Sequence, residues 1–272
     1  MNRTFLPPRR EAPVSYPVAQ WCHGDRGMTG GLEIPVRHFA DAGKISLPVV
    51  EVPHSEGREE AFLLERFHLA LVGWRPVRWE RRVGAILEVA PPELPEPWKH
   101  GYRSRRQILA VVREMWEAGY HGFLVLSFRA SAAQYLSRAL REAAEVRHRA
   151  GLVLGQRLPE YALWIPLRAG KRQRVETASG GVGSYISPIE VLYPQDLTPE
   201  SLEGFLIPEG VQAFIEGRLD EVALWEKGSA ESAPAAPRPS PERGARAEAQ
   251  AQAPAEAQAQ APAEAQAQAP AE

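Results

Sequence analysis

Residues 123–149, FLVLSFRASAAQYLSRALREAAEVRHR, contain the clearest strand and the clearest helix of the chain. The first seven residues form a compact apolar run with the length of a buried strand. Ser131 then begins an amphipathic helix that extends to about Arg149 and carries leucine and alanine on one stripe. A strand that leads directly into a long amphipathic helix indicates a protein that mixes both element types.

Alternating apolar residues predict further strands on both sides of this stretch. Before it, strands are expected at residues 47–52, 62–72, 77–79 and 85–89, and after it at residues 161–167 and 185–193. Between them, Ser104 predicts the start of another helix, which ends at Ala118 before Gly119. The expected fold class is α+β, with an antiparallel sheet or a small curled, OB-like barrel and two principal helices.

Composition divides the chain into four parts. Residues 1–13 read as a flexible arm, and residues 14–197 as the α+β core, in which Pro35 is expected to open a short helix that Gly43 closes. Residues 198–227 form an acidic helical segment packed on the core, with Thr198 before Pro199 at its start. Residues 228–272 read as a disordered tail, because they include three copies of AEAQAQAP and have few large apolar residues.

Residue usage bears on where and in what organism the protein works. The chain has 272 residues and one cysteine, Cys22, which excludes an internal disulfide, and no apolar run approaches the roughly 18 residues that span a bilayer. A cytoplasmic protein without a membrane role is therefore expected. Arg outnumbers Lys by 28 to 4, and Asn2 is the one asparagine. This bias indicates a GC-rich genome and favours a thermophile.

Charge is distributed unevenly along the chain. Residues 66–174 hold 20 basic and 9 acidic side chains, whereas residues 181–230 hold 2 basic and 9 acidic ones. A basic centre is thus followed by an acidic end.

Two short segments of the basic centre, residues 74–82 and 98–106, combine arginine with aromatic residues. On a strand, Arg78 and Arg82 share one face, and Trp79 and Arg81 share the other. Arginine and lysine neutralise phosphates while aromatic faces stack bases, which is the combination that single-stranded nucleic acid requires. The alternative, that the tryptophans belong to the core, stays open. The expected nucleic-acid-binding residues are Arg75, Arg78, Trp79, Arg81, Arg82, Trp98, Tyr102, Arg103, Arg105, Arg106, Lys171, Arg172 and Arg174.

The last three of these residues begin the loop KRQRVETASGGVGS, residues 171–184. Its glycines resemble a loop that offers backbone N–H groups to phosphate, but the spacing of a nucleotide-hydrolysing P-loop is absent. We expect a hairpin tip, which as a basic finger touches a nucleic acid backbone.

Candidate catalytic residues do not form a recognisable pattern. His23 and Asp25 lie beside Cys22, but no pair of histidines has metal-ligand spacing. We therefore expect no catalytic residues, metal or cofactor. An enzyme such as a metal-dependent nuclease is kept only as the third hypothesis, after the two given next.

The leading hypothesis is a non-enzymatic protein that binds nucleic acid, with single-stranded DNA favoured. The alternative is an interaction or scaffold protein of a phage or plasmid, whose basic centre meets its own acidic end or that of another copy. A homo-oligomer and a protein partner of the acidic end or tail both remain open.

Several short motifs remain in the chain. They are Tyr16 with Gln20-Trp21, Gly30-Gly31-Leu32 with Ile34-Pro35, Tyr161-Ala162-Leu163-Trp164-Ile165-Pro166, and Gly180-Gly181 with Pro188. These motifs resemble those of a family of uncharacterised bacterial proteins, encoded largely in cyanobacterial and related genomes and on mobile elements. The resemblance covers about residues 14–194 and implies no activity, although the mobile-element context favours DNA transactions.

Overall fold

The computed structural model describes residues 15–24, 30–54, 57–84, 86–174 and 185–231. The chain divides into two units, Met1–Ala233 and Pro234–Glu272, and all described residues belong to the first. The arm expected at residues 1–13 lies outside the described residues. Of the disordered tail expected at residues 228–272, residues 228–231 are helical, and the rest lies outside the described residues.

Strands dominate the first unit. The strands are β1 (Val18–Cys22), β2 (Gly31–Pro35), β3 (Val49–His54), β4 (Gly57–Leu64), β5 (Arg66–Trp74), β6 (Arg78–Val83), β7 (Ile86–Val89), β8 (Arg103–Val112), β9 (Leu124–Arg129), β10 (Ile165–Ala169), β11 (Gln173–Arg174), β12 (Tyr185–Ile186) and β13 (Ile189–Val191). All except β11 and β12, which pair with each other, belong to one sheet of the described structure.

Five α-helices and three short 3-10 turns accompany the strands in the described residues. They are α1 (Arg113–Glu117), α2 (Ser131–Leu154), α3 (Pro199–Glu203), α4 (Glu209–Glu216) and α5 (Leu219–Glu231), with the turns η1 (Val36–His38), η2 (Ala42–Lys44) and η3 (Pro97–His100). Residues 36–44, where one short helix was expected, therefore contain two separate 3-10 turns.

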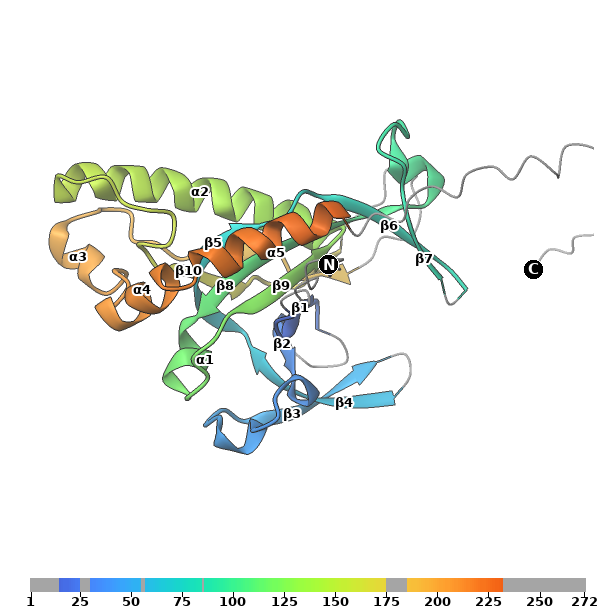
Figure 1. The fold of residues 1–272 in the computed structure, drawn as a ribbon, viewed down its shortest axis with the longest axis horizontal. Coiled ribbons are helices and arrows are strands. Elements are labelled where there is room, and N and C mark those ends of the chain that lie inside the picture. Colours follow the sequence, from blue (N-terminus) through green and yellow to red (C-terminus); the bar gives the residue numbers. More distant parts are fainter. Residues whose placement is uncertain (1–14, 25–29, 55–56, 85, 175–184, 232–272) are drawn as a thin grey trace, which may run out of the picture. The chain divides into compact units, whose positions relative to one another are not determined.

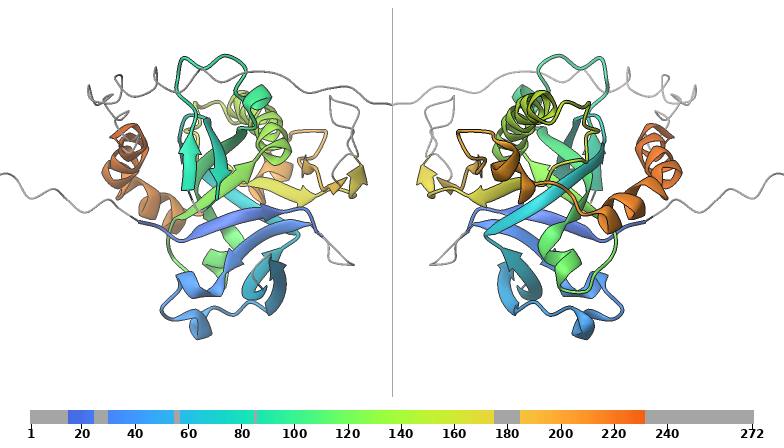
Figure 2. Two further views of the ribbon diagram at one scale, coloured as in Figure 1. Left: turned by 90° about the vertical axis from the view of Figure 1, so that its right-hand side faces the viewer. Right: turned by 90° about the vertical axis from the view of Figure 1, so that its left-hand side faces the viewer.

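The large sheet curls into a half-barrel (Figure 1, Figure 2). Its strands follow the order β13-β10-β5-β8-β9-β1-β2-β4-β3, and the hairpin of β6 and β7 extends it from β8. Neighbouring strands are antiparallel except β1 and β9, whose parallel register aligns Val18 with Val125. The expected α+β class with a curled barrel is confirmed, with one parallel pair inside the sheet.

The prediction of a helix from Ser104 to Ala118 is wrong. Residues 103–112 form β8, and only the five residues of α1 after them are helical. The run from Ile108 to Val112 is buried on both faces of the sheet, so all five residues are apolar. A continuous apolar run contains helical spacing as well as strand spacing, and periodicity alone does not separate the two. Pairing with β5 and β9 decides the outcome.

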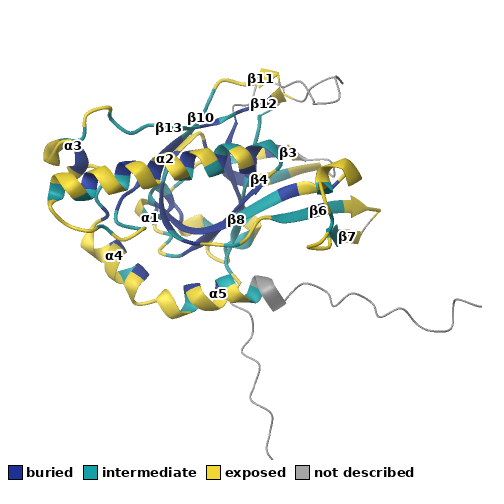
Figure 3. Cartoon of the chain, turned by 90° about the horizontal axis from the view of Figure 1, so that it is seen from above, coloured by how far each residue is buried: buried dark blue, intermediate teal, exposed yellow. Residues whose placement is uncertain are grey.

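The other principal helix is present and extends five residues beyond its expected end at about Arg149. Helix α2 begins at Ser131 and ends at Leu154, where Gly155 adopts a left-handed conformation with φ of 67°. Its buried stripe, which includes Leu136, Ala139 and Ala143, packs on one face of the sheet against β8 and β9 (Figure 3). We call this side of the sheet the α2 face.

The opposite face is covered by the acidic end of the chain. Leu109 on β8 and Val125 on β9 point to this side, where they join a second apolar cluster with Ile215 of α4 and Val222 and Trp225 of α5. We call this side the α5 face. The acidic end thus supplies part of the core as well as charge.

The acidic end forms three helices. Thr198 and Ser201 form a reciprocal capping box at α3, with Pro199 in the first turn. The start expected at Thr198 is therefore confirmed, while turns at Gly204 and Gly217 follow α3 and α4.

Ser187 fixes β1 against the segment that precedes β13. The Trp21 indole donates to the Ser187 carbonyl at 3.1 Å. A Cβ atom added to Gly30 would lie 2.6 Å from the Ser187 side chain, so the close approach requires glycine at this position.

Among the described helices, none is long and apolar enough to cross a membrane.

We predict that Trp225→Ala destabilises the protein by about 3 to 5 kcal/mol, because it removes a large side chain from the core on the α5 face. Trp225 is 4% exposed, whereas Leu224 on the same helix is 49% exposed. Chemical denaturation measures the change, with Leu224→Ala as control and an expected decrease within about 0.5 kcal/mol. A decrease for Trp225→Ala as small as that expected for Leu224→Ala would contradict a contribution of Trp225 to the core.

Candidate nucleic-acid interface

The pairing of β6 with β8 sorts the predicted site residues onto two faces. Arg78 lies opposite Arg105, and Trp79 lies opposite Ser104. Since directly opposite residues project to the same side of a sheet, Arg78 and Arg105 share one face and Trp79 takes the other. The strand places Arg78 and Arg82 on one face and Trp79 and Arg81 on the other, as expected.

Arginines gather on the α5 face beyond the end of the apolar cluster. The register continues from Arg105 to Arg129 on β9, so that Arg78, Arg105 and Arg129 lie in one row across three strands. Arg103 and Arg82 share this face by strand alternation. We call these five residues the arginine surface. Like charges directly opposite one another disfavour the folded state unless an anion is nearby.

One acidic side chain lies within this surface. Glu80 on β6 is 7% exposed, and its carboxylate accepts from Arg105 Nη1 at 3.4 Å. Arg105 Nε also donates to Ser127 Oγ at 2.9 Å. Arg105 is therefore held in place by the fold. The exposed Arg82, Arg103 and Arg129 form no ion pair with the described residues.

Arg129 was not among the residues expected from sequence. It ends the predicted strand at residues 123–129, and only the pairing of that strand with β8 brings it beside Arg105. The sequence signal was an arginine at the polar end of an apolar strand, which alone does not indicate a binding role.

Arg75 has a structural role at the edge of the arginine surface. Its Nε donates to the Trp225 carbonyl at 3.0 Å, and its guanidinium carbon lies 4.0 Å from the centre of the Trp225 ring. Burial lowers the pKa of Arg75, and the charges of Arg78 and Arg105 lower it further. The side chain thus joins α5 to the sheet.

The aromatic residues of the site lie on the α2 face. The Trp79 and Trp98 rings are 5.7 Å apart, and Trp98 is 56% exposed. Arg81 lies over the Tyr102 ring at 4.6 Å and donates to Glu88 Oε2 at 2.7 Å. Tyr102 itself is buried, so its ring is covered by the protein. Trp98 is the aromatic residue of this group that offers an open face.

The predicted basic finger is described only at its start. Lys171, Arg172 and Arg174 are exposed, and the Arg172 guanidinium lies 4.8 Å from the centre of the Tyr185 ring. The glycine-rich remainder, residues 175–184, lies outside the described residues. Gln173 Nε2 donates to Tyr135 Oη on α2 at 3.3 Å, which places the described start of the finger beside that helix.

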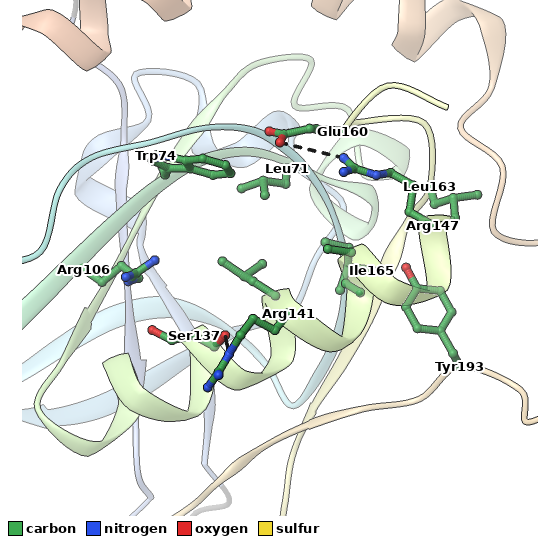
Figure 4. A pocket seen from close by; sticks show the side chains of 13 residues that line it. Leu71, Trp74, Arg106, Ser137, Arg141, Arg147, Glu160, Leu163, Ile165 and Tyr193 are labelled. Atoms are coloured by element: carbon green, nitrogen blue, oxygen red, sulfur yellow. Dashed lines mark hydrogen bonds and ion pairs between the residues drawn. The ribbon is translucent and has the colours of Figure 1, made fainter. Parts of the chain in front are cut away.

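Arg106 lies apart from the other arginines of the prediction. It follows Arg105 on β8, so it projects to the α2 face, where it lines a pocket of about 250 Å³ between the sheet and α2 (Figure 4). Its Nε is buried and has no hydrogen-bond partner in the described structure. No sequence signal pointed to this pocket, since its walls come from β5, β8, α2, β10 and the loops around them.

The residues beside Cys22 are occupied in holding the fold. His23 Nδ1 accepts from the Ser187 backbone N–H at 3.2 Å, and burial lowers the pKa of this imidazole. Burial raises the pKa of the Cys22 thiol. Asp25 lies outside the described residues. Within the described part of the chain, no three His, Cys, Asp or Glu side chains are placed to hold a metal.

Comparison of the chain with protein-family models, curated proteins and solved structures finds no match. The resemblance to the mobile-element family therefore stays a prediction.

We predict that Arg105→Ala lowers the free energy of unfolding by about 2 kcal/mol, because it leaves the buried Glu80 carboxylate and Ser127 without their partner. Arg103→Ala provides the matched control, since Arg103 is exposed on the same strand and face, with an expected change within about 0.5 kcal/mol. Urea denaturation measures both. A negligible effect of Arg105→Ala would contradict a structural role for the Glu80–Arg105 pair.

Proposed function

We propose that the protein binds nucleic acid without catalysing a reaction, and that single-stranded DNA is its preferred ligand. The observation that carries the proposal is the arginine surface, where Arg78, Arg105 and Arg129 lie opposite one another on three neighbouring strands. Glu80 compensates part of this positive charge within the fold, and a polyanion would gain a charge-assisted contact at each of the exposed guanidinium groups.

The geometry of the row suits a phosphodiester backbone. Neighbouring strands lie about 4.8 Å apart, so the row presents cations at short, regular intervals. Arg105 is fixed by Glu80 and Ser127, while Arg82, Arg103 and Arg129 have exposed side chains that can adjust to the phosphates. A guanidinium group donates two parallel hydrogen bonds to two oxygens of one phosphate, whereas the ammonium group of lysine acts as a point charge.

Trp98 supports the preference for single strands. Its 56% exposed ring is placed against Trp79, so a base can stack on it without a change of fold. Stacking on aromatic side chains contributes about 1 to 3 kcal/mol per base and requires unpaired bases. Because Trp98 lies on the α2 face, the base that stacks on it belongs to a different nucleotide from those whose phosphates contact the arginine surface.

The setting that we propose is the cytoplasm of a thermophilic bacterium, with the DNA of a mobile element as the ligand. Support comes from the single cysteine, the excess of arginine and the near absence of asparagine.

Replacement of Arg82, Arg103 and Arg129 by alanine is expected to weaken binding of a single-stranded oligonucleotide. It should also reduce the slope of log K against log salt concentration by about 0.7 for each phosphate that is no longer neutralised, because fewer counterions are released. Fluorescence anisotropy of a labelled oligonucleotide at several salt concentrations measures both quantities.

The control for this experiment removes the same charge elsewhere. Arg138, Arg149 and Arg157 are exposed, on α2 or just after it, and their joint replacement by alanine keeps the arginine surface intact. An equal decrease of the slope in both triple variants would refute a specific role for the arginine surface.

A second candidate function, an interaction or scaffold role, is favoured by the hairpin of β6 and β7. Val83, Ile86 and Leu87 are 49%, 67% and 51% exposed, and β7 pairs with β6 alone among the described strands. An exposed apolar group on an edge strand is typical of a surface that pairs with another chain. We propose a second copy of this protein as that partner.

Exchange of Val83 and Ile86, which lie opposite each other, for serine is expected to abolish self-association. Both side chains are exposed, so the fold should be retained. Sedimentation velocity over a range of concentrations reports the mass, with Leu152→Ser, exposed on α2, as control. A wild-type protein that stays monomeric throughout would exclude the second candidate.

A further inference from the structure

The pocket between α2 and the sheet has an apolar interior. It is lined by Leu71 of β5, Leu140 of α2, Ile165 of β10 and Leu163 just before β10, and Figure 4 shows hydrocarbon side chains at its centre. Trp74 is 45% exposed and stands at one side of the pocket (Figure 4). The volume of about 250 Å³ lies just below the range of roughly 300 to 1,000 Å³ that holds drug-sized ligands, which favours a small occupant.

Arginines surround this apolar interior. Arg106, Arg141 and Arg147 line the pocket together with one carboxylate, Glu160. Arg147 lies 3.9 Å from Glu160, so this pair is neutral as a unit. The positive charges of Arg106 and Arg141 remain. The pocket is therefore apolar inside and cationic at one end, and it favours an anion with an apolar body.

Arg106 is the group that most needs a ligand. A buried guanidinium N–H without a partner is unfavourable, because the group has left water and gained nothing in exchange. The side chain lies on the border of the pocket in Figure 4. A carboxylate placed there would accept from the guanidinium through a charge-assisted bond.

The other polar groups of the lining are already used within the protein. Ser137 Oγ donates to the Ala133 carbonyl at 2.7 Å, Tyr193 Oη donates to the Trp164 carbonyl at 2.9 Å, and Glu160 faces Arg147. A nucleobase needs hydrogen-bond partners for its edges, and this lining offers few. A saturated hydrocarbon chain needs none.

We propose that the pocket binds a small carboxylate with an aliphatic body, of the medium-chain fatty acid class. The chain occupies the space between Leu71, Leu140 and Ile165, and the carboxylate lies at Arg106, with Arg141 adding positive potential. This site is separate from the arginine surface, because Arg106 projects to the α2 face. The inference goes beyond the proposed function and does not depend on it.

The test is isothermal titration calorimetry of the full chain with sodium decanoate at concentrations below micelle formation. Wild-type protein should bind one decanoate, and decanol, which keeps the chain without the charge, should bind at least tenfold more weakly. Arg106→Gln should weaken decanoate binding about tenfold or more, since it removes a hydrogen bond between charged groups. Arg138→Gln, which changes an exposed arginine of α2 outside the pocket lining, should leave the affinity within twofold.

A second variant tests the apolar part without a change of charge. Ala144 is an exposed α2 residue that lines the pocket, and Ala144→Phe should reduce decanoate binding by filling space, while thermal unfolding confirms that the variant folds. The proposal is overturned if decanoate does not bind, if decanol binds as tightly, or if Arg106→Gln and Ala144→Phe bind decanoate like the wild type. Tighter binding of adenosine monophosphate than of decanoate, with the same dependence on Arg106, would also overturn it.

Discussion

Burial of the middle of the sheet on both faces is the constraint on which the rest of the structure depends. The second half of β8, from Ile108 to Val112, is almost fully buried, with α2 on one side and α4 and α5 on the other. Each face needs a covering helix, because exposed apolar strands would cost stability and invite aggregation. The acidic end of the chain is therefore a structural part of the core. Arg75 joins it to the sheet, because its guanidinium donates to the Trp225 carbonyl and lies over the Trp225 ring.

The candidate sites lie where this cover ends. The first half of β8, residues 103–107, is polar, and β6 rather than β5 pairs with its start. Strand alternation then sends Arg103 and Arg105 to the α5 face, and Arg106 to the α2 face. One five-residue segment thus contributes to two distinct surfaces, the row of arginines on the α5 face and the pocket on the α2 face. The buried Glu80 holds Arg105, which is the middle residue of the row.

Several elements were predictable because their signals are local. Helix α2 follows from its amphipathic stripe, the start of α3 from Thr198 and Pro199, and the separation of Arg78 from Trp79 from the period of a strand. Other elements were not. The five apolar residues at the end of β8 fit a helix as well as a strand. The short strands β1 and β2 lie in a glycine-rich stretch without clear alternation, and the contact of Gly30 with Ser187 joins residues far apart in the sequence.

The sequence by itself determined the α+β fold class, the basic centre, the acidic end and the two-faced character of β6, since each depends on composition or on neighbours along the chain. The tertiary structure alone decided that Arg129 joins the arginine surface and that Arg106 faces a pocket. It also decided that Arg75 packs against Trp225 and that Tyr102 is buried. The physical reason is that strand register and helix cover are set by contacts between residues far apart in sequence. No local pattern encodes which side of a sheet remains open.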